Sequence, residues 1–303
     1  MPVSVTDTIK RIIADRDAGI VSGREAVLRL LAEARQQIVA ELAAAPADSF
    51  SGYHLNRSLA AIADALDGFE AGFRGELKSR LIDSWELGAS ILPEAAAAAG
   101  MQLGSFRISA ETLDALTDYA FTRISGVRAD AMNRIKAELT LGILGQKTPQ
   151  DVAGELAAQL KGLPLPKGRF GHPIFKSVAE RAEVITGLEM GRAFSMATEN
   201  SIEAAGQTLP DIRRMWLHAG HPKQARQVHV LMHGQVRKIG KPFFRSTSGG
   251  APVFYPRAPD APIAEVIRCG CTHIPYLPEW GDAKGFANDF DARQAQANQP
   301  KGA

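Results

Sequence analysis

Hydrophobic residues recur at heptad spacing between residues 53 and 91, where they form the most regular pattern in the chain. The repeating positions are separated alternately by four and three residues: Leu55, Leu59, Ile62, Leu66, Phe69 and Phe73. This spacing predicts a long helix with an apolar seam that packs against another long helix. We expect the second helix to come from the same chain, although a helix of a neighbouring subunit would satisfy the same pattern.

Helical periodicity extends over the rest of the first 160 residues. A short helix is expected at 5–18, and Ser22 with Glu25 forms a capping box that predicts a second helix ending near residue 45. Pro93 and the alanine-rich run after it are expected to end the seam helix. The remaining predicted helices cover 109–144, 148–160 and 174–206, and the segment 161–173, rich in proline and glycine, is predicted to be a loop.

The helical period is lost after residue 207, and short strands are expected instead. Their predicted positions are 215–218, 227–232 and 236–244, followed by a helical turn and a final strand within 263–277. The predicted fold class is therefore α+β and mainly α, with a long-helix N-terminal region followed by a small mixed α+β C-terminal module. The expected parts are a helical region at 1–145, which is a candidate for binding a portal or other partner, the module at 146–280, and a polar tail at 281–303.

Composition excludes several classes of protein. The 303 residues give room for about two domains, and two cysteines are too few for a disulfide framework. No apolar run approaches the roughly eighteen residues expected of a membrane-spanning helix. The N-terminal sequence lacks the apolar run of a signal peptide, so we expect folding in a reducing cytoplasm.

Charge is distributed unevenly along the chain. Residues 1–160 carry 16 lysines and arginines against 21 acidic residues, whereas residues 161–303 carry 19 against 12. Within 207–257, nine basic residues face a single acid, Asp211. This asymmetry favours contact with a polyanion or an acidic partner, and a solvated basic face is the alternative. The candidate DNA contacts are Arg213, Arg214, Lys223, Arg237, Lys238, Lys241 and Arg245.

Histidine and cysteine are concentrated in one part of the chain, since both cysteines and five of the seven histidines lie between residues 218 and 273. Cys269 and Cys271 form a C-x-C pair that could hold zinc, with His229, His233 or His273 completing the ligand set. His229 and His233 are four residues apart and would share one side of a helix or of a strand. The alternatives are two reduced thiols packed as small apolar groups, and a His229 that bonds to the backbone.

Four short motifs follow one another within residues 135–277. They are Arg181 and Glu183 in a predicted helix, Trp216 in a predicted strand, Arg226, His229 and Gly234 in the next segment, and Cys269 with Cys271 near the end. In this order and spacing, the C-terminal half resembles the phage Mu F-like head morphogenesis family, the minor head proteins of tailed bacteriophages and prophages. Four positions depart from the family pattern: Ala182, His233, Arg268 and Gly270 stand where threonine, aspartate, asparagine and arginine are usual.

The resemblance implies a structural protein that assists head assembly, DNA packaging or genome delivery. Its implied partners are the portal protein, packaged double-stranded DNA and the major capsid protein, with multiple copies around the portal. The implied location is the virion head near the portal vertex, reached from the host cytoplasm during assembly. The resemblance implies no enzymatic activity, no catalytic residue, no membrane and no cofactor, with zinc as the exception that the cysteines leave open.

Two other functions remain open on the residues alone. Glu183, Arg226 and His229 could form the centre of a nucleic-acid-processing enzyme or of a toxin-like domain, because acid–base catalysis needs a histidine and a carboxylate within hydrogen-bond reach. Alternatively, zinc held by the cysteines and by His229 or His233 could stabilise a DNA-binding module without any role in a phage.

Overall fold

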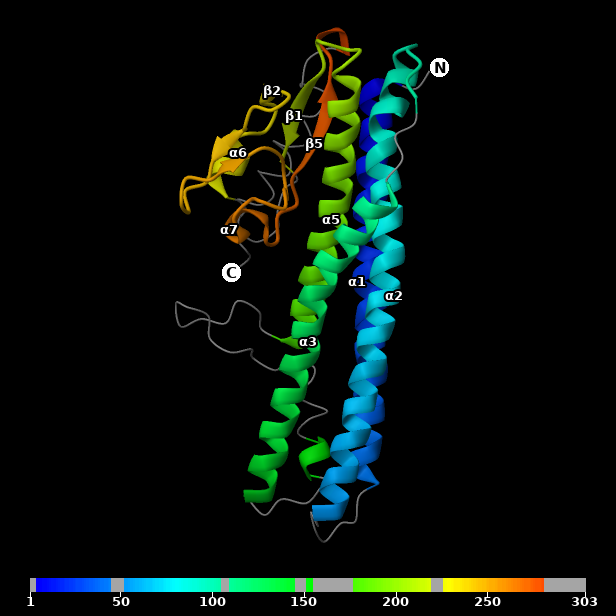
Figure 1. Cartoon of the computed structure of the whole chain (residues 1–303), viewed down its shortest axis with the longest axis vertical. Helices are drawn as coiled ribbons and strands as arrows, with labels where there is room; N and C mark the ends of the chain where they lie inside the picture. Colours follow the sequence, from blue (N-terminus) through cyan, green and yellow to red (C-terminus); the bar gives the residue numbers. More distant parts are fainter. Residues whose placement is uncertain are drawn as a thin grey trace, which may run out of the picture. The chain divides into compact units, whose positions relative to one another are not determined.

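The computed structural model describes residues 4–44, 52–104, 109–144, 151–154, 177–218 and 226–280. The fold is α+β and mainly α, as predicted, with long helices followed by a small mixed region (Figure 1). The long helices are α1 (Val5–Ala43), α2 (Gly52–Ala98), α3 (Ala110–Leu144) and α5 (Val178–Ala205). Several predictions lie outside the described residues: the boundary at 145/146, the loop 161–173, most of the helix 148–160, the contact Lys223 and the tail 281–303.

The chain divides into two compact units, and each is assembled from segments far apart in sequence. One unit combines Met1–Ile20, Arg80–Leu113 and Leu188–Ala303, and we call it the sheet unit because it contains all the described strands. The other combines Val21–Ser79 and Asp114–Gly187, and we call it the helical unit.

The apolar seam is buried inside the helical unit. Ile62, Leu66, Phe69 and Phe73 are at most 3% exposed, and the rings of the two phenylalanines lie 5.7 Å apart. The facing positions on α1 and α3 are also buried: Val27, Leu31, Ile38, Leu42, Leu116, Ile124, Val127 and Ile135. The prediction of packing within the chain is therefore confirmed. The idea that this seam accepts a partner helix is wrong, because the chain already covers it.

Two predicted helix ends are wrong. α1 is continuous from Val5 to Ala43, so Ser22 lies inside it and caps nothing. The glycines at positions 19 and 23 each cost a helix only about 1 kcal/mol, which the buried apolar face of α1 offsets. α2 continues through Pro93 to Ala98, because Leu92, Ala95 and Ala96 around the proline are completely buried. Gly100, with a φ of 79°, follows the end of this helix.

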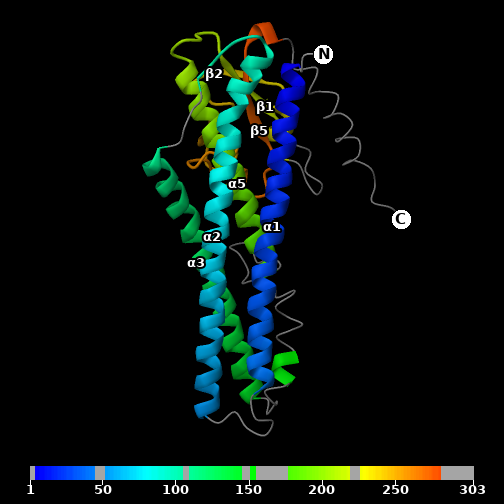
Figure 2. The ribbon, with the colours of Figure 1, turned by 90° about the vertical axis from the view of Figure 1, so that its right-hand side faces the viewer.

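A three-stranded antiparallel sheet in the order β2–β1–β5 forms the centre of the sheet unit (Figure 2). Its strands are β1 (Arg213–Leu217), β2 (Val236–Lys238) and β5 (Thr272–Tyr276), with Trp216 directly opposite His273. A second ladder joins β3 (Phe244–Arg245) to β4 (Pro252–Val253). The strand at Trp216 and the last strand are therefore confirmed.

One face of this sheet packs on the ends of the long helices that belong to the same unit. Met215, Leu217 and Ile274 form one apolar cluster with Ile9 and Ile12 of α1, Ile91 of α2 and Phe194 of α5. Because side chains alternate along a strand, Arg214, Trp216 and His273 share the other face. The packing of α2 on α5 is close: a Cβ atom at Gly88 would collide with the backbone carbonyl of Phe194. The long helices thus provide a platform for the sheet.

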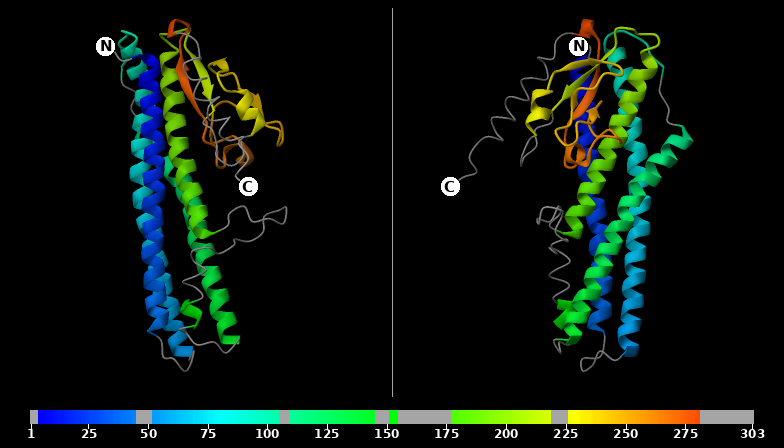
Figure 3. Two further views of the ribbon diagram at one scale, coloured as in Figure 1. Left: turned by 180° about the vertical axis from the view of Figure 1, so that it is seen from behind. Right: turned by 60° about the vertical axis from the view of Figure 1, so that its left-hand side comes forward.

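Two short helices lie between strands in the sequence: α6 (Gln227–Leu231) follows β1, and α7 (Ile263–Val266) precedes β5. They are coloured yellow and orange in Figure 3. The prediction of a strand at 227–232 is therefore wrong, whereas the helical turn before the final strand is confirmed. A run of five residues is too short for its hydrophobic period to separate helix from strand. Among the described helices, none is both long and apolar enough to cross a lipid bilayer.

Candidate metal centre

Residues from three of the motif segments converge in the core of the sheet unit. The imidazole of His229, on α6, lies 5.3 Å from the indole of Trp216, on β1, with the two rings edge to face. Its Nδ1 atom lies 3.5 Å from Sγ of Cys269 and 3.6 Å from Sγ of Cys271. All four side chains are at most 7% exposed. The sequence places these residues up to 55 positions apart, and the fold brings them into one cluster.

Backbone and guanidinium contacts hold α6 in place beside this cluster. Gly234 adopts a φ of 73° and donates its N–H to the carbonyl of Trp216 at 2.8 Å, so the chain returns to the sheet directly after α6. Arg226, at the start of α6, donates to the carbonyls of Ala264 and Ile267 at 2.7 Å each. These bonds tie α6 to α7, and they assign structural roles to the motif residues Arg226 and Gly234.

The two cysteines follow α7 in a backbone turn of unusual conformation. Arg268 adopts a φ of 52°, in the left-handed region that costs a residue other than glycine about 1 kcal/mol or more. The Cys269 N–H then bonds to the carbonyl of Val266 at 3.1 Å. Arg257, whose φ is 62°, donates from its guanidinium to the Cys269 carbonyl, with the Nε bond at 2.8 Å. This turn directs both sulfur atoms towards the same imidazole nitrogen.

A buried carboxylate orients the imidazole from its other side. His229 Nε2 lies 3.0 Å from Oε2 of Glu265, a residue of α7 that is 4% exposed. The second oxygen of Glu265 accepts a bond of 2.7 Å from the hydroxyl of Ser246, which is also buried. A carboxylate on Nε2 favours the tautomer that carries its proton there, so Nδ1 presents its lone pair to the two cysteines.

The local charges favour one thiolate in this cluster. A hydrogen bond from Cys271 and the positive charge of Arg257 hold the pKa of Cys269 well below the usual range of a thiol. Burial, with the neighbouring Cys269, raises the pKa of Cys271 well above that range. Burial also lowers the pKa of Arg257 to about 10, which leaves its guanidinium charged at neutral pH. The more acidic of the two thiols, Cys269, is therefore the one that accepts hydrogen bonds from the Arg257 guanidinium at its backbone carbonyl.

Three of the predicted metal ligands meet, and two do not. His229, Cys269 and Cys271 offer one nitrogen and two sulfur atoms that all lie within 4.8 Å of one another. His233 is not part of this group, because its Nδ1 atom accepts the backbone N–H of His218 at 3.1 Å. His273 lies on β5 with its Nε2 atom 3.1 Å from the Glu199 carboxylate. The structure thus selects His229 among the three histidines that the sequence offered.

The other two motif residues belong to the helical unit. Arg181, on α5, forms an ion pair with Asp130 of α3, and both side chains are about one quarter exposed. Glu183 lies two positions further along the same helix. The enzyme alternative would require Glu183 beside His229, whereas within the sheet unit that position is taken by Glu265.

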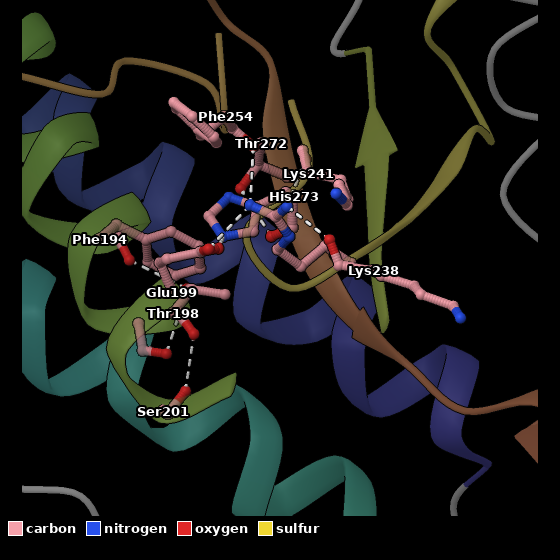
Figure 4. A network of polar contacts seen from close by, with 11 residues as sticks. Phe194, Thr198, Glu199, Ser201, Lys238, Lys241, Phe254, Thr272 and His273 are labelled. Atoms are coloured by element: carbon pink, nitrogen blue, oxygen red, sulfur yellow. Dashed lines mark hydrogen bonds and ion pairs between the residues drawn. The ribbon is translucent and has the colours of Figure 1, made fainter. Parts of the chain in front are cut away.

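One of the candidate DNA contacts is wrong. Arg214 is completely buried and pairs with Glu199 of α5 at 2.8 Å. Figure 4 shows the polar network around Glu199, with His273 beside it. The two terminal guanidinium nitrogens of Arg214 also donate to the carbonyls of Phe254, Lys238 and Lys241. On β1, Arg214 points to the same side as Trp216, which is why a residue within a basic run is buried. It has no surface from which to contact a phosphate.

The other described candidates lie nearer the surface. Lys238, Lys241 and Arg245 are exposed, and Arg213 and Arg237 are half-buried. Arg213 also pairs with Asp211 at 3.2 Å, so part of its charge is already neutralised. The described basic surface is therefore smaller than the sequence predicted.

Three residues of the centre were not predicted from the sequence: Glu265, Ser246 and Arg257. A signal for Glu265 was present, since it is the only acidic residue within the run Ile263–Thr272 that leads into the cysteines. Ser246 and Arg257 lie in irregular segments where no periodicity indicates which side chains face inward.

No protein-family model matches the chain, and neither a curated protein nor a solved structure is significantly similar to it.

Proposed function

We propose that this chain is a structural minor head protein of a tailed bacteriophage or prophage. It associates with the portal in several copies at the portal vertex of the virion head, and it assists head assembly, DNA packaging or genome delivery. The portal protein is its main partner, and packaged double-stranded DNA and the major capsid protein are further partners. The chain reaches the head from the host cytoplasm during assembly.

The convergence of the motif residues carries this proposal. Trp216, His229 and the two cysteines lie in three separate segments, and their order along the chain resembles that of the phage Mu F-like family. Residues selected by chance from separate segments would be scattered over the fold, whereas these form one buried cluster. Arg226 and Gly234 support the same cluster through backbone bonds. The proposal is therefore supported by a set of contacts among the residues that carry the resemblance.

The burial of the centre favours a structural protein over an enzyme. His229 and Glu265 form a histidine–carboxylate pair with a cysteine on the opposite nitrogen, an arrangement that could activate a nucleophile. However, His229 is 3% exposed, Glu265 4%, and Cys271 2%, and a substrate must reach the nucleophile. The single observation in favour of catalysis is thus the geometry of the His229–Glu265 pair. The burial of this pair argues against catalysis.

The exposed basic residues are the candidate contacts with packaged DNA. Reversing Lys238, Lys241 and Arg245 to glutamate is expected to weaken binding to double-stranded DNA without regard to sequence, since lysine and arginine contact phosphates. The slope of log affinity against log salt should fall by roughly 3 for three lost contacts. Fluorescence anisotropy on one DNA duplex over a range of salt concentrations measures both effects.

A variant with the same change in charge on the helical unit provides the control. Arg29, Lys78 and Lys136 are exposed there, and their reversal to glutamate changes the net charge by the same amount. If both triple variants bind DNA equally, net charge alone governs binding and the sheet unit has no DNA contact of its own. If the unmodified chain does not bind DNA, the DNA part of the proposal is wrong.

Co-purification with a portal protein tests the proposal as a whole. The full chain is expressed together with the portal protein encoded beside it, and the complex is purified through a tag on the portal. We expect a ring that retains this chain at a fixed stoichiometry at physiological salt, with a tagged unrelated ring as the control. A folded chain that does not associate with the portal would contradict the proposed function.

A further inference from the structure

We propose that His229, Cys269 and Cys271 bind one Zn²⁺ ion, which joins α6 to the turn that follows α7. Zinc accepts thiolate and imidazole ligands in tetrahedral sites, and this cluster supplies two sulfur atoms and one nitrogen. The inference is independent of the proposed function, because a zinc site would be equally compatible with a protein that has no role in a phage.

The distances match those of a tetrahedral zinc site. With Zn–S bonds of about 2.3 Å and a Zn–N bond of about 2.0–2.1 Å, the nitrogen and each sulfur lie about 3.5–3.6 Å apart. The observed separations from Nδ1 of His229 are 3.5 Å to Cys269 and 3.6 Å to Cys271. Neutral Nδ1 has a single lone pair, so it can accept a good hydrogen bond from only one thiol. Two sulfur atoms at nearly equal distances are better explained by an ion between the three atoms.

The surroundings of His229 are those of a metal ligand. Metal-binding histidines usually donate their other ring N–H to a carboxylate, which fixes the ring and raises its basicity. Glu265 occupies that position at 3.0 Å, and Ser246 fixes Glu265 in turn. The left-handed backbone at Arg268 fixes the direction of both cysteines. The imidazole and the two thiols are therefore oriented by different parts of the fold.

A metal would also explain how this part of the sheet unit is stabilised. β3 and β4 contain two residues each, and α7 contains four, which are too short to be stable by themselves. His229 is separated by 40 residues from Cys269 and by 42 residues from Cys271. One ion would therefore close the long irregular segment between α6 and the cysteines. The described residues supply three of the four ligands that a tetrahedral site takes, and the fourth is identified by the measurement below.

Metal analysis of the full chain is the direct test. After purification with zinc in the growth medium and dialysis against metal-free buffer, we expect about one zinc per chain by plasma mass spectrometry. Zinc displaces thiol protons when it binds, so titration of the apoprotein in weak buffer should release protons. Cys269→Ser, Cys271→Ser and His229→Gln should each lose most of the zinc, and His233→Gln, outside the group, should retain it.

Two measurements on the unmodified chain keep the test decisive if these variants fail to fold. Cobalt added to the apoprotein should give the absorption bands of a tetrahedral ion with sulfur-to-metal charge transfer, and X-ray absorption of the zinc form should show two sulfur neighbours and reveal the fourth ligand. Chelation should lower the Tm by on the order of 10 °C, because a tightly bound ion stabilises the folded state alone.

Three results would each overturn the proposal. The first is a folded chain that retains no zinc and gives no cobalt–sulfur bands. The second is zinc that all the ligand variants retain, which would place the ion elsewhere. The third is a Cys269–Cys271 disulfide in protein purified under reducing conditions, which would indicate a redox pair in place of a metal site.

Discussion

Replacing Arg214 by methionine is expected to destabilise the sheet unit by about 3–5 kcal/mol, because one partner of a buried ion pair is lost while the other stays in the core. The Glu199 carboxyl group would stay in a site where it is 4% exposed, without its arginine partner and with His273 Nε2 3.1 Å away. The carbonyls of Phe254, Lys238 and Lys241 would also lose their donor. Urea unfolding followed by circular dichroism measures the loss.

The adjacent residue on the same strand provides a matched control. Arg213 is half-buried and pairs with Asp211, which is exposed, so Arg213→Met should cost no more than about 1 kcal/mol. Arg214→Lys should fall between the two, because an ammonium group cannot reproduce the planar fork that reaches four acceptors. Equal unfolding midpoints for Arg213→Met and Arg214→Met would show that the Arg214–Glu199 pair contributes nothing to stability.

Trp216→Ala is expected to have a comparable effect, about 3–5 kcal/mol, because it leaves a large cavity in the core of the sheet unit. The indole lies 5.3 Å from the rings of His229 and Phe243 and 5.6 Å from that of Phe244. Its removal therefore also deprives the His229 imidazole of its contact with the indole. Trp216→Phe should cost less, since it keeps part of the aromatic contact. Unfolding in guanidinium chloride, followed by circular dichroism, gives the differences.

Leu231→Ala is the control for this substitution. Leu231 lies on α6, two residues after His229, and is 61% exposed, so its truncation should change stability by less than about 0.5 kcal/mol. A Trp216→Ala variant as stable as Leu231→Ala would contradict the assignment of Trp216 to the core.

The architecture was predictable from the sequence wherever the hydrophobic period was long. The seam from Ile62 to Phe73 fixes both the helix and its buried face, and the structure confirms both. The ends of helices were less predictable, because Ser22 and Pro93 are local signals that tertiary packing overrides. In the short elements after residue 207, burial depends on contacts with distant segments: Arg214 pairs with Glu199 of α5, and α6 is tied to α7. Neither the helix α6 nor the buried position of Arg214 was therefore predicted.

For the candidate site, residue chemistry identified the donors but could not choose among them. His229, His233 and His273 were equal candidates beside Cys269 and Cys271, since spacing alone does not show which imidazole turns towards the sulfur atoms. The structure distinguishes them through the partners that hold each ring: Glu265 for His229, the His218 N–H for His233, and Glu199 for His273. Such partners come from other segments of the chain, so a local motif cannot contain them.

The location of this chain in assembled heads tests the central claim most directly. Heads of the phage or prophage that encodes the chain would be purified and imaged by electron cryomicroscopy, with and without an electron-dense label on the chain. The proposed function predicts the label at one vertex per head, the portal vertex, in several copies. A chain that is absent from purified heads, or that is spread over all vertices of the shell, would contradict it.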